Sequence, residues 1–216
     1  MRIIAVTLAT LASATVAAAE TTVTADAPTV TVSGTLTFAS RYVSDGVEYS
    51  TGAVIQPYVE LGYAGFYAGI WATNAEEDLL GANSEVDYYL GYRGEAGTFY
   101  YDVGYGYYTY PGASELNSGE VLVSGGVGFD ETLYLTAAFA YSDEFETLDS
   151  SLQIDYYTPV EGLALSALYG DNDTWEYWSL GANYAVSERF SVDLTWHETD
   201  LTAVDGLFVF SLETTF

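Results

Sequence analysis

Carboxylates at alternate positions of apolar segments are the residues of this chain best placed to do chemistry. The sequence holds 31 Asp and Glu against four Lys and Arg, with one histidine and no cysteine. Eight acids, two arginines and the histidine fall on the polar side of these segments. This candidate pore-lining set comprises Arg41, Glu60, Asp87, Arg93, Asp102, Glu120, Asp149, Asp155, Asp193, His197 and Glu213. Carboxylates around a narrow passage favour cations, and acids facing arginines across it would orient polar solutes in a transverse field.

Catalysis and metal binding find little support among these residues. His197 has no serine at the spacing of the outer-membrane phospholipases that use a Ser–His pair. In "HETD" (197–200) adjacent side chains of a strand point in opposite directions, and only one nitrogen ligand is present. The loops "AEED" (75–78) and "GDNDTWE" (170–176) offer oxygen ligands without the rest of a calcium loop. We therefore expect no enzyme, no cofactor and no specific metal site, with weak Ca²⁺ or Mg²⁺ bridging as the alternative for the loops.

The overall charge and composition exclude other classes of protein. A formal net charge of −27 argues against nucleic acid as a partner, because such affinity comes from neutralising phosphates. The acidity does not indicate disorder, since 50% of the residues are hydrophobic and 16% are aromatic. The absence of cysteine rules out a disulfide framework and thiolate chemistry.

The elements that must position the carboxylates are short β-strands. In "FYYDVGYGY" (99–107) the odd positions are Phe, Tyr, Val, Tyr and Tyr, whereas the even positions are Tyr, Asp, Gly and Gly. This period of two is typical of a strand with one apolar face. Twelve such segments are predicted near 33–43, 53–63, 66–74, 85–94, 97–110, 118–129, 132–142, 146–158, 163–170, 175–185, 189–199 and 206–216.

The connections between these segments favour a transmembrane barrel. Short turns alternate with mostly longer, acidic loops, and an even number of strands of about ten residues is typical of outer-membrane β-barrels. In hydrocarbon every backbone amide needs an internal partner, which a closed sheet provides. The many tyrosines suit the bilayer interface, and the terminal Phe216 fits an assembly signal. A soluble β-sandwich, which would also alternate, is the alternative fold.

The N-terminal residues predict export. Met1-Arg2 is followed by a short apolar stretch and then Ala17-Ala18-Ala19, which indicates a signal peptide over 1–19. The Thr-rich residues 20–32 are predicted to be a flexible lead, and residues 33–216 are predicted to form the barrel.

Several stretches resemble a known family. The stretches "LTFASRYVSDGV" (36–47), "GFYAGIWATN" (65–74), "EVDYYLGYRG" (85–94) and "FYYDVGYGYYTYPG" (99–112) are similar to the TorF family of porin-like proteins from Gram-negative bacteria. The resemblance is best over 33–112 and implies an outer-membrane location and pore activity, without naming a substrate. One departure is Asp45 before Gly46, where the family commonly has a basic residue; this weakens a shared anion-binding role for that loop.

Two functions follow from these observations. The first is a passive, narrow, cation-preferring channel for ions or small solutes in the outer membrane. The alternative is a filled, non-conducting barrel that acts through its acidic outer loops. The expected partners are outer-membrane lipid and lipopolysaccharide, the barrel-assembly machinery, and small cations or solutes.

Overall fold

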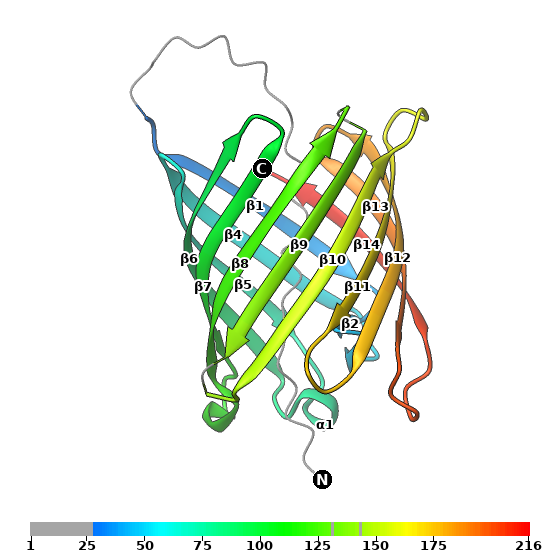
Figure 1. Ribbon diagram of the computed structural model, residues 1–216. Coiled ribbons are helices and arrows are strands. Elements are labelled where there is room, and N and C mark those ends of the chain that lie inside the picture. Colours follow the sequence, from blue (N-terminus) through cyan, green and yellow to red (C-terminus); the bar gives the residue numbers. More distant parts are fainter. Residues whose placement is uncertain (1–27, 131, 143) are drawn as a thin grey trace.

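Alternating apolar and polar residues form twelve strands that close into one antiparallel barrel (Figure 1). The computed structural model describes residues 28–130, 132–142 and 144–216. The barrel strands are β1 (Thr31–Ala39), β4 (Val54–Tyr63), β5 (Phe66–Asn74), β6 (Ser84–Ala96), β7 (Phe99–Thr109), β8 (Ser118–Phe129), β9 (Leu133–Ser142), β10 (Thr147–Tyr157), β11 (Leu163–Asp171), β12 (Glu176–Ser187), β13 (Phe190–Thr199) and β14 (Leu207–Thr215). The predicted fold class is therefore confirmed.

Four shorter elements lie in the connections. They are β2 (Tyr42–Ser44), β3 (Val47–Ser50), the helix α1 (Glu77–Leu80) and the 3-10 helix η1 (Ser114–Leu116). No helix in the described ranges is long and apolar enough to span a bilayer. The predicted signal peptide 1–19 and most of the predicted lead 20–32 lie outside the described residues.

Hydrogen bonds between the first and last strands close the ring. β1 pairs with β14 in a register that sets Phe38 opposite Leu212. Just beyond the end of β14, the amide of Phe216 donates to the carbonyl of Gly34 in β1 and the amide of Gly34 donates to the carbonyl of Phe216, both at 3.0 Å. Each barrel strand thus has two partners, so the wall has no open edge.

The two ends of the barrel differ, and we call them the turn end and the loop end. The turn end, at the top of Figure 1, carries tight connections such as Ala64-Gly65, whose φ angles of 52° and 88° suit a two-residue hairpin. The loop end, at the bottom, carries α1, η1 and the longer connections, including residues 40–53, 75–83 and 200–206.

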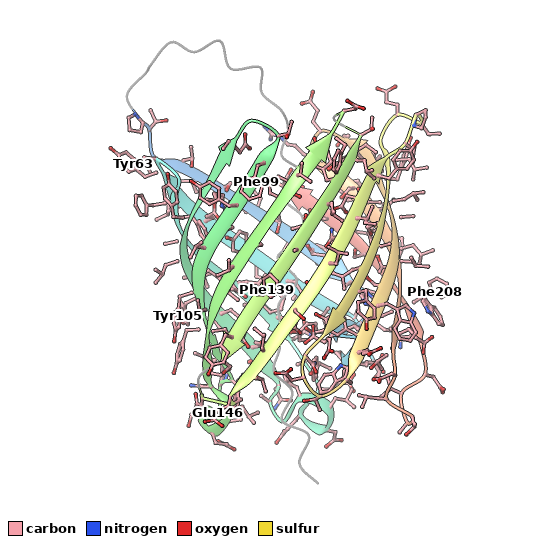
Figure 2. All side chains as sticks on the ribbon, viewed as in Figure 1. Tyr63, Phe99, Tyr105, Phe139, Glu146 and Phe208 are labelled. Atoms are coloured by element: carbon pink, nitrogen blue, oxygen red, sulfur yellow. The ribbon has the colours of Figure 1, made fainter. Side chains whose placement is uncertain are left out.

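Apolar side chains cover the outer face and are graded along the barrel axis. Tyr63, Tyr105 and Phe208 project away from the wall in Figure 2. Exposed aromatic side chains gather near the turn end (Tyr63, Phe66, Tyr92, Phe99, Phe129, Tyr156, Tyr184, Phe190 and Phe216) and near the loop end (Tyr88, Tyr105, Tyr107, Tyr141, Tyr169, Trp178 and Phe208). Between these two girdles the exposed residues are mainly aliphatic: Val59, Ile70, Leu90, Val103, Val123, Leu152, Leu165, Leu180 and Leu194. This grading is the one expected of a surface that crosses hydrocarbon between two interfaces.

The first predicted segment, 33–43, is wrong at its C-terminal end. The barrel strand begins at Thr31 and stops at Ala39, and Tyr42–Ser44 belongs to β2, which pairs with β3 in a separate two-stranded sheet. Alternation continues through both strands, so the period of two could not show where one ends. The chain leaves the wall at Ser40-Arg41 and turns inward instead.

Candidate functional site

Ten of the eleven candidate residues lie in barrel strands, opposite the exposed apolar side chains. Glu60 on β4, for example, alternates with Val59 and Leu61, which are 44% and 54% exposed, whereas Glu60 is 9% exposed. The same alternation sets the following residues on the inner face: Asp87, Arg93, Asp102, Glu120, Asp149, Asp155, Asp193, His197 and Glu213. Arg41 is the exception, because it lies between β1 and β2 rather than in the wall.

Arg93 is held by acids of its own wall. Its Nη2 donates to Glu60 Oε2 at 2.7 Å, and its Nε lies 3.3 Å from Asp102 Oδ2. Its guanidinium carbon lies 4.0 Å from the centre of the Tyr67 ring, an attractive cation–π geometry. Tyr67 and Tyr58 donate their hydroxyls to Asp102 and Glu60 at 2.8 Å and 2.7 Å.

The arrangement around Arg93 differs from the expected transverse field. Glu60, Arg93 and Asp102 lie on β4, β6 and β7, which are near neighbours in the sheet. Arg41 is likewise satisfied locally, by an ion pair with Glu48 of β3. The two arginines therefore do not face acids across the lumen. A cavity of about 340 Å³ opens beside the Arg93 group at the turn end, lined in part by Thr31, Glu60 and Arg93.

The β2–β3 hairpin lies inside the mouth at the loop end. Its two-residue turn is Asp45-Gly46, with φ angles of 50° and 76°, which suits a type I′ turn. Tyr42 and Tyr49 on the hairpin are only 4% and 2% exposed. The ring of Tyr42 packs 5.8 Å from that of Trp71 on β5. Sequence reasoning left open whether any loop folds inward, and the structure shows that this one does.

The hairpin connects two separate parts of the wall. On one side the hydroxyl of Tyr42 donates to Glu85 on β6 at 2.9 Å. At the tip, the indole Nε1 of Trp175 donates to the carbonyl of Asp45 at 2.8 Å. Gly46 is so close to β13 that a Cβ there would lie 2.7 Å from the carbonyl oxygen of Glu198. The hairpin therefore narrows the loop-end mouth.

Glu85 is an inner-face acid that the candidate set missed. It is fully buried and accepts hydrogen bonds from Tyr42 and, at 3.0 Å, from the hydroxyl of Tyr110. Its position two residues before Asp87 on β6 was the signal that could have found it, because residues i and i+2 of a strand share a face.

Glu76 fastens the return of the hairpin to the connection between β5 and α1, in which Glu76 lies. Its Oε1 accepts hydrogen bonds from the Thr51 hydroxyl at 2.8 Å, the Thr51 amide at 2.9 Å and the Gly52 amide at 3.0 Å. These donors, the Thr51 hydroxyl above all, hold the pKa of Glu76 below its ordinary value of 4.5. These hydrogen bonds, which we call the Glu76 clamp, therefore depend on the ionised carboxylate.

The remaining inner-face acids divide into a buried and a half-exposed group. Near the hairpin, Asp87, Glu120 and Asp149 are at most 2% exposed. Nearer the turn end, Asp155, Asp193 and Glu213 are half-buried; they accept hydrogen bonds from Gln153, Thr195 and Thr37, respectively. The half-exposed group has no ion pair with any basic residue in the described ranges.

His197 and the acidic loops give no indication of a reaction centre. His197 is half-buried on the inner face of β13, and among the described residues its imidazole makes no hydrogen bond or ion pair. Within the same ranges, no group of three or more His, Cys, Asp or Glu side chains has the arrangement of a metal site.

Comparison with protein families matches residues 22–211 to the family described as "Bacterial protein of unknown function (Gcw_chp)". The chain belongs to the Gcw_chp family. A search of curated proteins found no match to this chain.

The fold of this Gcw_chp protein is similar to that of solved porins. The KdgM porin superposes with a TM-score of 0.65 at 8% identity, covering 85% of this chain and 98% of that one. A KdgM porin in complex with disordered oligogalacturonate gives 0.64 at 9% identity with the same coverage. The NanC porin gives 0.56 at 9% identity, covering 86% of this chain and 98% of that one. At these identities the likeness establishes the barrel fold alone.

Proposed function

We propose that this Gcw_chp protein is a passive channel of the outer membrane, with a narrow acidic lumen that prefers cations. The solutes are ions or small molecules. The observation that carries the proposal is the half-exposed group of Asp155, Asp193 and Glu213, which face the barrel interior without a basic partner in the described ranges. Carboxylates that stay hydrated and unpaired along a passage attract cations and repel anions.

The outer surface supports a membrane location. Two aromatic girdles flank an aliphatic belt, and every barrel strand is paired on both sides. Such a surface is stable in hydrocarbon and unfavourable in water. We infer that the turn end faces the periplasm and the loop end faces outward, toward lipopolysaccharide, as in outer-membrane barrels generally. A signal peptide over 1–19 and recognition of Phe216 by the assembly machinery belong to the same proposal, as does the resemblance to TorF-family porins.

The proposed selectivity differs from what the solved relatives suggest. Oligogalacturonate, present with the KdgM porin, is an acidic oligosaccharide. The acids on the inner face of this chain would repel such a ligand, because the one arginine in its barrel strands, Arg93, is already paired with Glu60 and Asp102. The shared fold therefore gives no reason to expect that this protein binds oligogalacturonate.

A filled barrel is the alternative, and the β2–β3 hairpin favours it. Tyr42, Tyr49 and Glu120 are at most 4% exposed, so the mouth is well packed on the hairpin side. A filled barrel would conduct nothing, and its role would be sought in the acidic loops at the loop end.

Planar-bilayer recording across a KCl gradient separates the two functions. Refolded protein is first checked on an SDS gel, where an unboiled closed barrel migrates differently from the boiled chain. Discrete conductance steps with a cation-side reversal potential are expected. An anion-side potential would refute the selectivity, and silence from verified barrels would establish the filled alternative.

A further inference from the structure

Tyrosine rings lie against the inner wall where inward-facing glycines leave room for them. Tyr67 covers two such glycines: a Cβ on Gly91 would lie 2.5 Å from its Cζ, and one on Gly104 would lie 2.7 Å from its hydroxyl. One face of the ring therefore rests on the wall and the other faces the interior. The guanidinium of Arg93 occupies that free face, 4.0 Å from the ring centre.

The Arg93 group shows which chemistry such a ring attracts. Glu60 and Asp102 both pair with Arg93, so a delocalised cation is held between one tyrosine face and two carboxylates. This is the combination by which proteins bind organic cations: an aromatic face supplies the quadrupole and an acid supplies the opposite charge. Here the cation is a side chain of the protein itself.

A second group, which also combines tyrosine rings with a carboxylate, lies near the turn end, and among the described residues its carboxylate has no ion pair with a basic side chain. Tyr100 covers Gly126, and Tyr134 covers Gly128, where a Cβ would lie 2.9 Å from the Tyr134 ring. The ring of Tyr157 meets that of Tyr134 at a centroid distance of 5.6 Å and an angle of 78°. The rings of Tyr100 and Tyr134 are 6.4 Å apart at 48°. Three rings thus present surfaces in different directions.

Asp155 supplies the carboxylate of this second group. It lies directly opposite Tyr134 in the β9–β10 register, two residues before Tyr157. The amide of Gln153 holds both of its oxygens, at 2.8 Å and 2.9 Å. Asp155 is half-buried and Tyr157 is 39% exposed, so the group is open to solvent on the inner side.

We propose that Tyr100, Tyr134, Tyr157 and Asp155 form a binding site for an organic ammonium cation, which we call the tyrosine cage. Rings set at steep angles enclose a rounded cation from several sides, whereas a sugar needs one flat face on which to stack. The carboxylate and the overall negative charge of the chain add to the preference for a cation. The inference rests on the proposed channel in one respect, because the cation reaches the cage through a water-filled interior.

Calorimetric titration of the folded protein with choline chloride tests the cage. The protein is held in a non-ionic polyoxyethylene detergent, and the neutral isostere 3,3-dimethylbutan-1-ol and glucose are titrated in parallel. Choline is expected to bind and its uncharged isostere is not. Tyr157→Leu and Asp155→Asn are each expected to weaken choline binding by about tenfold, a factor between those of fully exposed and desolvated cation–π contacts, as suits a half-exposed site.

Tyr156→Leu is the matched control, because Tyr156 is the neighbouring residue of the same strand and faces outward at 40% exposure. It should bind choline as the wild type does. Equal affinity for the isostere, or binding of glucose in place of choline, would overturn the cation assignment, and absence of choline binding would overturn the site. Conductance of the same preparation separates the two proposals. Barrels that conduct but do not bind choline would refute only the tyrosine cage. Barrels that bind choline but do not conduct would refute only the channel.

Discussion

Replacing Gly46 by valine should release the β2–β3 hairpin from the wall and widen the loop-end mouth. Gly46 has a φ of 76°, a conformation that costs a residue with a Cβ about 1–2 kcal/mol. The new Cβ would also lie 2.7 Å from the carbonyl oxygen of Glu198, and overpacking against backbone costs about 1–3 kcal/mol. Together these terms amount to about 2–5 kcal/mol, which shifts the docked-to-released ratio by about 30- to 5,000-fold.

Two measurements follow this release. Single-channel conductance should rise in Gly46→Val, because the hairpin no longer crosses the mouth. Tryptophan emission should move to longer wavelength, because Trp175 is 4% exposed and loses the hydrogen bond from its indole to Asp45. Folding is verified by heat-dependent migration on an SDS gel, so that a misassembled barrel is not counted as a released hairpin.

Gly112→Val is the matched control for backbone strain. Gly112 also has a positive φ, 92°, but a Cβ there would meet nothing within 4 Å, and it lies outside the hairpin. This variant should keep the wild-type conductance and emission. If Gly46→Val behaves like Gly112→Val in both measurements, the hairpin does not limit the mouth and the reasoning fails.

Three further predictions concern charge, pH and assembly. Neutralising Asp193 and Glu213 together (D193N/E213Q) should move the reversal potential toward zero. Glu120→Gln should leave the reversal potential nearly unchanged, because Glu120 is buried beside the hairpin. The opposite ranking would place the permeation path along the side of the barrel that carries Glu120. The depressed pKa of Glu76 means that its hydrogen bonds to Thr51 and Gly52 are fully present above about pH 4.5 and are lost as the pH falls through its lower folded pKa. The difference in conductance between wild type and Glu76→Gln, compared at the same pH, should therefore disappear on acidification; a difference that persists would show that the ionised carboxylate does not hold the hairpin. Removing Phe216 should lower the yield of heat-resistant barrel in cells, since its backbone completes two hydrogen bonds to β1; unchanged yield would show that neither these bonds nor the terminal ring matters.

The wall of the barrel was predictable because its pattern is local. Each strand alternates at a period of two, and the exposed residues of β7 are Phe99, Val103, Tyr105 and Tyr107, as the pattern indicates. The predicted segment 66–74 coincides with β5, and 118–129 coincides with β8. The outer face of the wall is apolar and the inner face is polar. A shift of one residue in the register of a strand would therefore turn all its polar side chains to the apolar outer face.

The hairpin was not predictable from alternation, although one signal for it was present. The stretch "RYVSDGVEYS" (41–50) continues the period of two from β1, so the pattern shows no break. Asp45-Gly46 between alternating residues is the strongest short-range signal of a hairpin. That signal predicts a turn but not its destination, because docking depends on Trp175, far away along the chain.

The hydrogen-bond and ion-pair partners of the inner-face acids could not be predicted from the sequence either, because many of these partners lie on other strands. Glu60 and Arg93 are 33 residues apart and meet because β4 and β6 flank β5. Composition suggested that acids and arginines would oppose one another across the lumen. With so few basic residues, most acids instead needed another kind of donor.

Tyrosine supplies that donor, and this gives the many tyrosines a second role beside the lipid interface. Tyrosine hydroxyls donate to Glu60, Glu85, Asp87, Asp102 and Asp149 at 2.7–3.0 Å. A lysine or arginine in these positions would satisfy the same oxygens but cancel their charge. A phenol donates a hydrogen bond to a carboxylate while remaining neutral, so these acids are hydrogen-bonded without a further cation in the lumen. Tyrosine therefore lets the interior be packed and hydrogen-bonded without adding positive charge that would oppose the cation preference of the half-exposed group.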